Sequence, residues 1–239
     1  MRWQVSRRSI SASKSLVTRM TPTSDPTHPI AELRQYTLHP GRRDALVALF
    51  DREFVETQEA LGIVVLGQFR DLDDPDRFVW LRGFASMPAR AQALASFYDG
   101  PVWRAHREAA NATMIDSDNV LLLRPTAAGP MPIDAWQRDD NGPRHGALLA
   151  IVDARGRDHA PAIARVRGEL VARYETEPSP NTFARLPVRE GESVGVWLVR
   201  CADIAACTQL AAALAQTPNG FDAPAQLLRL EPTARSRFS

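Results

Sequence analysis

The chain has 239 residues, enough for one large domain or two small ones. Hydrophobic residues make up 44% and charged residues 24%, a composition that excludes collagen-like, low-complexity and globally disordered proteins. The formal net charge of +1 gives no general attraction to nucleic acid or to an anionic membrane, and no apolar run approaches the roughly 18 residues that cross a bilayer. We therefore expect neither nucleic acid nor a membrane as a partner.

The first 30 residues differ from the rest in composition. Five basic residues and a series of serines precede the first acidic residue, Asp25, but the apolar stretch of a secretory signal is missing. The composition favours a disordered extension over residues 1–30. Translation starts at Met1 or at Met20. The arginine- and alanine-rich composition is typical of GC-rich bacterial coding, so we expect a cytoplasmic protein. The alternative is an organellar transit peptide in residues 1–20, which would place the protein in mitochondria.

Residues 31–124 show a first set of periodic elements. Apolar residues at three- and four-residue steps predict an amphipathic helix that Gly62 ends, and Pro101 must break the second helical region because proline lacks an amide hydrogen. The expected elements are a strand at 32–38, a helix at 42–60, strands at 63–69 and 77–84, helical residues at 88–114 with a break at 99–101, and a strand at 119–123.

The second half repeats the same order of elements after a Pro- and Gly-rich linker at 125–143. Within a second domain at 144–231 the expected elements are a strand at 147–152, a helix from Asp158 whose apolar stripe reaches Tyr174, strands at 182–188 and 194–200, a helix at 204–215 and a strand at 225–230; a tail follows at 232–239.

Two consecutive βαββαβ units indicate an internal duplication of ferredoxin-like modules. In such a module the helices cover one face of the sheet, so the other face must be buried against something else. The second sheet of the same chain is the obvious partner. We therefore expect an α+β fold, in which tandem ferredoxin-like units pack sheet-on-sheet as a dimeric α/β-barrel within one chain.

The first half resembles the NIPSNAP family of dimeric α/β-barrel proteins. The resemblance begins at the run Glu32-Leu33-Arg34-Gln35-Tyr36-Thr37-Leu38-His39-Pro40-Gly41, close to the family's opening E-x-R-x-Y-x-x-x-P-G. It continues through the glycines and aromatic strand that follow to the Asp99/Trp103 segment, and it covers residues 31–124. The family strand usually reads W-x-Y, whereas here Arg82 follows Trp80, so a pocket carried over from the family is altered.

The resemblance implies a ferredoxin-like fold and little settled chemistry. Relatives in the wider superfamily include cofactor-independent monooxygenases and haem-binding enzymes, and eukaryotic members are associated with mitochondria and protein partners. The residues themselves contain no nucleotide-binding glycine motif and no metal-binding spacing, so no cofactor is identified.

Two strands of the first half carry the candidate site. Arg34 and Tyr36 share a face of the first strand with Glu32, and Trp80 and Arg82 share a face of a neighbouring strand. Such a pocket can hold a carboxylate or an enolate oxygen, while the alternative is a structural pair between Arg34 and a buried carboxylate. Trp103 and His106 on the covering helix are further pocket candidates, with His106 as a base or haem ligand, and His39 is a candidate at the rim.

Two other motifs are interpreted as structural. Gly191–Gly195 matches G-x-S-x-G, but a strand rather than a helix follows the serine and no histidine lies downstream, so we expect a turn. Cys201 and Cys207 are expected to be buried apolar side chains. The sequence thus favours a small-molecule-binding or protein-interaction module that can form homo-oligomers. The alternatives are a cofactor-independent monooxygenase-like enzyme acting on a small apolar or aromatic carbonyl compound, and a haem-binding relative.

Overall fold

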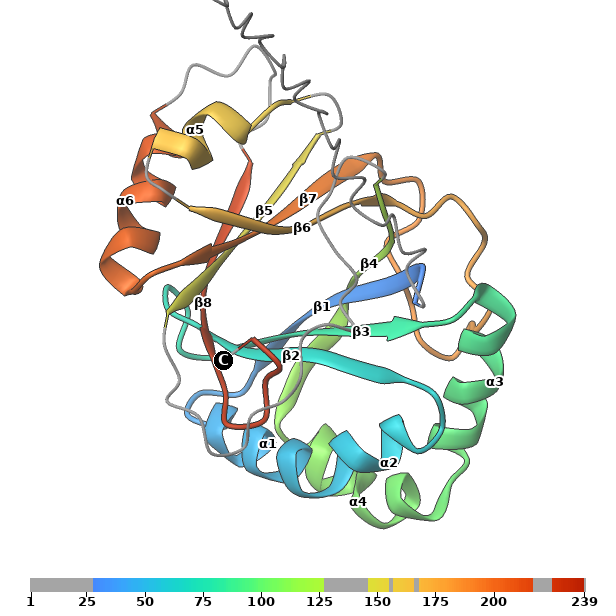
Figure 1. Cartoon of the computed structure of the whole chain (residues 1–239). Helices are drawn as coiled ribbons and strands as arrows, with labels where there is room; N and C mark the ends of the chain where they lie inside the picture. Colours follow the sequence, from blue (N-terminus) through green and yellow to red (C-terminus); the bar gives the residue numbers. More distant parts are fainter. Residues whose placement is uncertain (1–27, 127–145, 155–156, 166–167, 217–224, 239) are drawn as a thin grey trace, which may run out of the picture.

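The computed structural model describes residues 28–126, 146–154, 157–165, 168–216 and 225–238, and within them eight strands close into one barrel (Figure 1). Helices pack on the outside of the barrel, five helical pieces against one half and two against the other. Most of the expected linker at 125–143 and of the N-terminal extension lies outside the described residues, and Pro125, the expected first residue of the linker, belongs to a strand.

The first half follows the predicted order of elements. These are β1 (Ile30–Leu38), α1 (Arg43–Leu49), η1 (Phe50–Phe54), α2 (Val55–Glu59), β2 (Val64–Asp71), β3 (Arg77–Phe84), α3 (Met87–Tyr98), α4 (Pro101–Asn111) and β4 (Met114–Pro125). The predicted helix at 42–60 is confirmed, with a π-helical turn, η1, in its middle. Gly62, with a φ of 81°, follows this helix, and Gly100 and Pro101 separate α3 from α4 as predicted.

The second half has the predicted order but different boundaries. Its elements are β5 (Ala147–Ala154), α5 (Ala160–Arg165), β6 (Glu169–Thr176), β7 (Val194–Cys201), α6 (Ile204–Ala215) and β8 (Gln226–Pro232). The predicted helical stripe up to Tyr174 is wrong: the amide of Gly168 bonds to the carbonyl of Ile163, and the chain then enters β6. Leu170–Tyr174 pair with β7, with a β-bulge that mimics helical spacing of the buried side chains.

The predicted strand at 182–188 is also wrong. Residues 177–193, which we call the crossing segment, contain no helix or strand and link β6 to β7. Pro187 has no amide hydrogen for a strand ladder, and the neighbouring polar groups bond to the first half instead. Ser193 is followed by strand β7, which agrees with a turn rather than a nucleophile elbow.

The strand order around the barrel is β1-β3-β2-β8-β5-β7-β6-β4, and every neighbouring pair is antiparallel. The order in the first half is therefore β4-β1-β3-β2, and in the same direction around the barrel the second half has the equivalent order β8-β5-β7-β6. Two short ladders join the halves: Phe69–Asp71 pair with Leu230–Pro232, and Leu123–Pro125 pair with Tyr174–Thr176. The barrel is thus a mixed fold of strands and helices closed within one chain.

Alternation along the strands divides the apolar core into three layers. One face of β3 points into the barrel through Val79 and Leu81, and the opposite face packs under the helices through Phe78, Trp80 and Phe84, as predicted. A third layer lies between the strands of the second half and the helices α5 and α6 that cover them. Both cysteines are buried in this layer. No helix in the described part of the chain is long and apolar enough to cross a membrane.

Candidate functional site

A buried ion cluster lies between the sheet of the first half and helix α3. Its centre is Glu32 on β1, which is fully buried. Arg90 Nε on α3 donates to Glu32 Oε1 at 2.6 Å. Arg34 Nη1 on β1 and Arg82 Nε on β3 both donate to Glu32 Oε2 at 2.7 Å. One carboxylate thus holds three guanidinium groups, none of them more than 1% exposed.

The register of β1 and β3 and the helical periodicity of α3 explain how these four residues meet. Glu32 lies directly opposite Arg82 in the β1–β3 ladder, and Arg34 lies two residues further on the same face of β1. Arg90 belongs to the buried stripe of α3 together with Ala93, Leu94 and Phe97, so helical periodicity turns it toward the sheet.

The cluster carries more positive than negative charge. Burial alone would raise the pKa of Glu32, but the guanidinium groups of Arg82, Arg34 and Arg90 outweigh this effect and hold the pKa well below its usual range. Burial lowers the pKa of Arg90 despite its contact with Glu32. With the carboxylate ionised, three cations face one anion, an arrangement that is costly unless other groups share the charge.

Neutral acceptors share part of the excess charge. Arg34 Nε donates to the Tyr36 hydroxyl at 3.0 Å, and Arg82 Nη1 donates to Gln58 Oε1 at 3.2 Å. Arg90 Nη1 donates to Asn181 Oδ1 at 3.0 Å, a contact with the crossing segment. Arg90 Nη2 is buried and has no hydrogen-bond partner among the described residues.

A small cavity of about 30 Å³ adjoins this cluster, enough for one or two water molecules. It lies between β1 and β3 on one side and the covering helices on the other. Its lining is predominantly aromatic and consists of Tyr36, Leu46, Phe50, Phe54, Gln58, Trp80, Phe97, Tyr98, Trp103, Ala110 and Met114. The guanidinium of Arg82 stacks 4.9 Å from the centre of the Trp80 ring, so the positive cluster lies directly behind the cavity wall.

The predicted site residues fall into three positions. Tyr36, Trp80 and Trp103 line the cavity, whereas Arg34 and Arg82 lie behind its wall in the ion cluster, where Arg34 forms the predicted pair with a buried carboxylate. His106 lies outside the cavity: its Nε2 is 3.4 Å from Glu53 Oε2, and its side chain is 32% exposed. His39 also lies outside the cavity: it is exposed, and its amide donates to the Thr113 carbonyl.

The fold and this cavity can be compared with known proteins. Residues 31–130 match the family model NIPSNAP. After this match we call residues 31–126 the NIPSNAP domain. No curated protein matches the chain.

Solved structures are similar to one half or to both halves of the chain. A NIPSNAP-like domain protein from Burkholderia xenovorans is 24% identical over 44% of this chain and 92% of its own, with a TM-score of 0.41. Two candidate monooxygenases match across both halves. The protein from Fusobacterium nucleatum is 10% identical over 86% of this chain and 93% of its own, with a TM-score of 0.52. The protein from Lactobacillus acidophilus is 13% identical over 86% and 94%, with a TM-score of 0.50. At these identities the likeness concerns the fold alone.

The crossing segment of the second half covers one side of the NIPSNAP domain. Phe183 stacks on Tyr98 with ring centres 6.0 Å apart, and the Thr182 hydroxyl donates to the Met87 carbonyl. An exposed ion pair joins Arg185 to Asp99. Tyr98, which lines the NIPSNAP cavity, therefore also contacts the second half of the chain.

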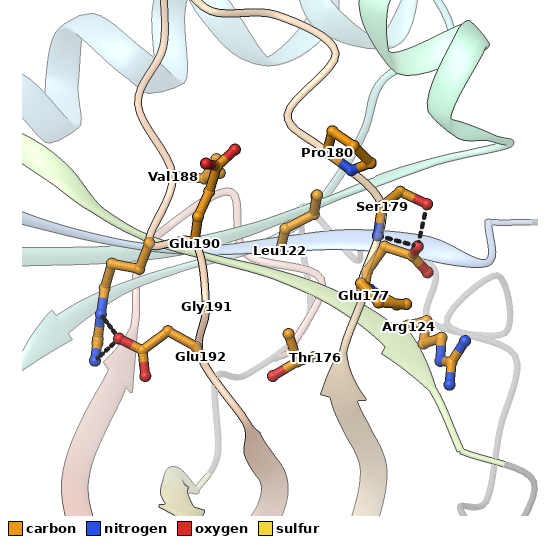
Figure 2. Close-up of a pocket in the computed structure, with 12 residues that line it drawn as sticks. Leu122, Arg124, Thr176, Glu177, Ser179, Pro180, Val188, Glu190, Gly191 and Glu192 are labelled. Atoms are coloured by element: carbon orange, nitrogen blue, oxygen red, sulfur yellow. Dashed lines mark hydrogen bonds and ion pairs between the residues drawn. The ribbon is translucent and has the colours of Figure 1, made fainter.

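An open groove of about 420 Å³ lies where the crossing segment meets β4 and β6 (Figure 2). Leu122 forms its floor, and charged side chains stand around its edge. These charged groups have local partners: Arg189 pairs with Glu192, Arg124 pairs with Glu175, and Glu177 accepts from the Ser179 hydroxyl. The groove is larger than the NIPSNAP cavity, but its polar groups satisfy one another.

Sequence reasoning missed Arg90, Tyr98 and Gln58 as members of the site. Arg90 carried a usable signal, because a charged residue stands where the apolar stripe of α3 requires a buried one. Tyr98 and Gln58 carried none, since each is an ordinary helical residue whose contacts with Phe183 and Arg82, respectively, join distant parts of the sequence.

Proposed function

We propose that the chain is a small-molecule-binding protein whose ligand occupies the cavity of the NIPSNAP domain. The observation that carries this proposal is an aromatic cavity beside a fully buried ion cluster. Apolar lining with a few fixed polar groups is the usual character of a ligand pocket. At about 30 Å³ the space holds only a small compound or one end of a larger one, so a larger ligand requires side chains to move.

A cavity-filling variant tests this proposal. Ala110 on α4 lines the cavity, and Ala110→Val adds two methyl groups to that space. Ala93→Val is the matched control, because Ala93 is buried on α3 without lining the cavity. Ligand-detected NMR with a set of small aromatic compounds should show binding to the parent chain and the control, and loss in Ala110→Val. Equal binding to all three proteins would contradict the proposal.

We also infer that the barrel consists of two ferredoxin-like units in tandem within one chain. Both halves have the order βαββαβ, and both place their first and third strands in the centre of four. This shared topology supports an internal duplication whose residues have diverged.

Monooxygenase-like catalysis is the second candidate. The candidate monooxygenases that share the fold motivate it, together with a phenol that lies against a guanidinium: the Tyr36 hydroxyl accepts from Arg34. An arginine lowers the energy of an enolate oxygen, and a phenol can deliver a proton. Oxygen consumption with small aromatic carbonyl compounds that is abolished by Tyr36→Phe would favour it over simple binding.

Four further proposals rank lower. They are haem binding through His106, interaction with a protein partner, formation of a homo-oligomer and a cytoplasmic location. A haem ligated by His106 would have to replace the contact with Glu53 at the surface of α4. The visible spectrum and the native mass of the purified chain test haem and oligomer formation together: a Soret band supports the first, and a doubled mass supports the second.

A further inference from the structure

The polar groups of the NIPSNAP cavity are unbalanced toward hydrogen-bond donors. The Trp80 indole Nε1 is buried and has no acceptor among the described residues, although its ring lines the cavity. The Tyr36 hydroxyl already accepts from Arg34 Nε, so its own proton is left for another partner. The Tyr98 hydroxyl is a third donor in the lining.

Burial keeps Tyr98 in its donor form. Desolvation raises the pKa of Tyr98 above the ordinary value for a phenol, so the hydroxyl carries its proton at neutral pH. An indole N–H never loses its proton under these conditions and cannot accept.

The side-chain amide in the lining offers no acceptor to balance these donors. Gln58 Oε1 accepts from Arg82 Nη1 at 3.2 Å, and Gln58 Nε2 donates to the Phe54 carbonyl at 3.1 Å. Both ends of this amide are therefore engaged outside the cavity.

Positive charge lies directly behind the donors. The guanidinium carbon of Arg34 is 5.4 Å from the Tyr36 ring centre and 5.7 Å from the Trp80 ring centre. Arg34 and Arg82 share the single carboxylate of Glu32 with Arg90, so this wall retains uncompensated positive charge. Donors in front and cations behind favour a negatively charged acceptor in the space between.

We infer that the cavity binds the carboxylate group of a small organic acid. This inference rests on the proposed small-molecule function and adds the chemical class of the ligand. A carboxylate supplies two oxygens for the donors of Tyr36, Tyr98 and Trp80, and its charge offsets the excess of the arginine cluster. The cavity holds a free formate or the carboxylate end of a larger acid whose apolar body displaces the aromatic wall.

Titration calorimetry of the full chain at constant ionic strength distinguishes these two sources. Sodium formate probes the headgroup alone, phenylacetate probes a carboxylate with an aromatic body, and phenylacetamide is its neutral counterpart. We expect phenylacetate to bind at least tenfold more tightly than phenylacetamide, because a hydrogen bond to a charged group is stronger than one to a neutral amide. Binding of formate as well would assign the headgroup site independently of the body.

Variants then locate the binding. Tyr36→Phe removes one donor and should weaken phenylacetate binding about tenfold, while Tyr174→Phe, a buried tyrosine in the barrel interior, should leave it unchanged. Circular dichroism and the midpoint of thermal unfolding verify that both variants fold. If Tyr36→Phe does not fold, phenylacetate binding is measured with Tyr98→Phe instead.

The outcomes separate this inference from the proposed function. If phenylacetamide binds as tightly as phenylacetate and loses affinity in Ala110→Val, the cavity is a ligand site but the carboxylate assignment is wrong. If chloride binds as tightly as formate, the site recognises charge without carboxylate geometry, which also overturns the assignment. If neither aromatic compound nor formate binds, both proposals fall.

Discussion

At the scale of single residues, the most unusual feature is the sharing of one buried carboxylate by three buried arginines. Glu32 uses both oxygens, and each arginine reaches it from a different direction. A buried ion pair is weak evidence for net stability, but removing one partner leaves a buried charge without compensation. We therefore expect the loss of Glu32 to destabilise the fold strongly.

Glu32→Gln should lower the free energy of unfolding by about 3–5 kcal/mol, because three guanidinium groups then repel one another without a counter-charge. Glu169→Gln is the control, since Glu169 is 64% exposed and pairs with Arg200 at the surface. Its loss should stay below about 1 kcal/mol. Urea unfolding measures both values; equal losses in the two variants would contradict a central role for Glu32.

The pH dependence of stability should report the same residue. The folded-state pKa of Glu32 lies below its unfolded value, so its stabilising effect is complete above the unfolded pKa of about 4.3 and is lost as the pH falls toward the folded value. Unfolding free energy between pH 5 and pH 3 should therefore fall less steeply in Glu32→Gln than in the parent chain. Parallel curves would show that Glu32 keeps its ordinary pKa in the fold.

At the scale of elements, the crossing segment connects the second half to the site. It runs for residues 177–193 without helix or strand, a length at which ordered loops usually have a role. Its contacts with Tyr98, Arg90 and the Met87 carbonyl place it against the NIPSNAP domain. It thus contacts one residue of the cavity wall, Tyr98, and one residue of the ion cluster, Arg90.

Phe183→Ala removes the ring that stacks on Tyr98 and should speed amide exchange in the crossing segment while leaving β3 protected. The global loss of stability should be about 1–2 kcal/mol, because Phe183 is only half-buried. Glu169→Ala in β6 is the control, since its ion pair with Arg200 is exposed and lies outside the crossing segment. Hydrogen exchange measured by mass spectrometry checks this prediction. Equally faster exchange in the crossing segment and in β3 would contradict it.

Strand β2 contains a tightly packed glycine at its bulge. A Cβ at Gly67 would lie 2.5 Å from the Phe69 ring and 2.9 Å from the Phe238 ring. Gly67→Ala should therefore cost about 1–3 kcal/mol as both rings shift. Gly83→Ala on the neighbouring strand meets its nearest side-chain atom at 3.2 Å and should cost less. Thermal unfolding of the two variants compares them directly; the reverse order would contradict the packing argument.

At the scale of the whole molecule, two short ladders and the last residues of the chain hold the halves together. After β8 the chain returns to the NIPSNAP domain, where Thr233 donates its amide to the Gln68 carbonyl and Phe238 packs 5.4 Å from the Phe69 ring. The barrel interior contains side chains from both halves in one cluster. The halves should consequently unfold together.

We expect a single unfolding transition in urea, coincident by circular dichroism and tryptophan fluorescence. Phe238→Ala should move this whole transition, with a loss of about 3 kcal/mol, because the ring is 4% exposed inside the shared interior. Two separate transitions, or a shift in one of two, would show that the halves are independent domains.

Local pattern by itself determined the first half almost completely. Strand alternation predicted which residues of β3 share a face, and the missing amide of Pro101 predicted the break between α3 and α4. These features depend on neighbours within a few residues, which the sequence displays directly. The second half was less readable, because the bulge in β6 imitates helical spacing and the crossing segment takes its conformation from partners in the other half.

Only the tertiary structure decided the composition of the site. Alternation predicted which strand faces carry Arg34, Tyr36 and Trp80. The contact of Arg90 with Glu32, 58 residues away in the sequence, depends instead on how α3 packs over the sheet. The return of Phe238 to the barrel interior is equally non-local. Such contacts form because closing the barrel buries apolar surface from both halves at once, and no local pattern encodes which distant side chains then meet.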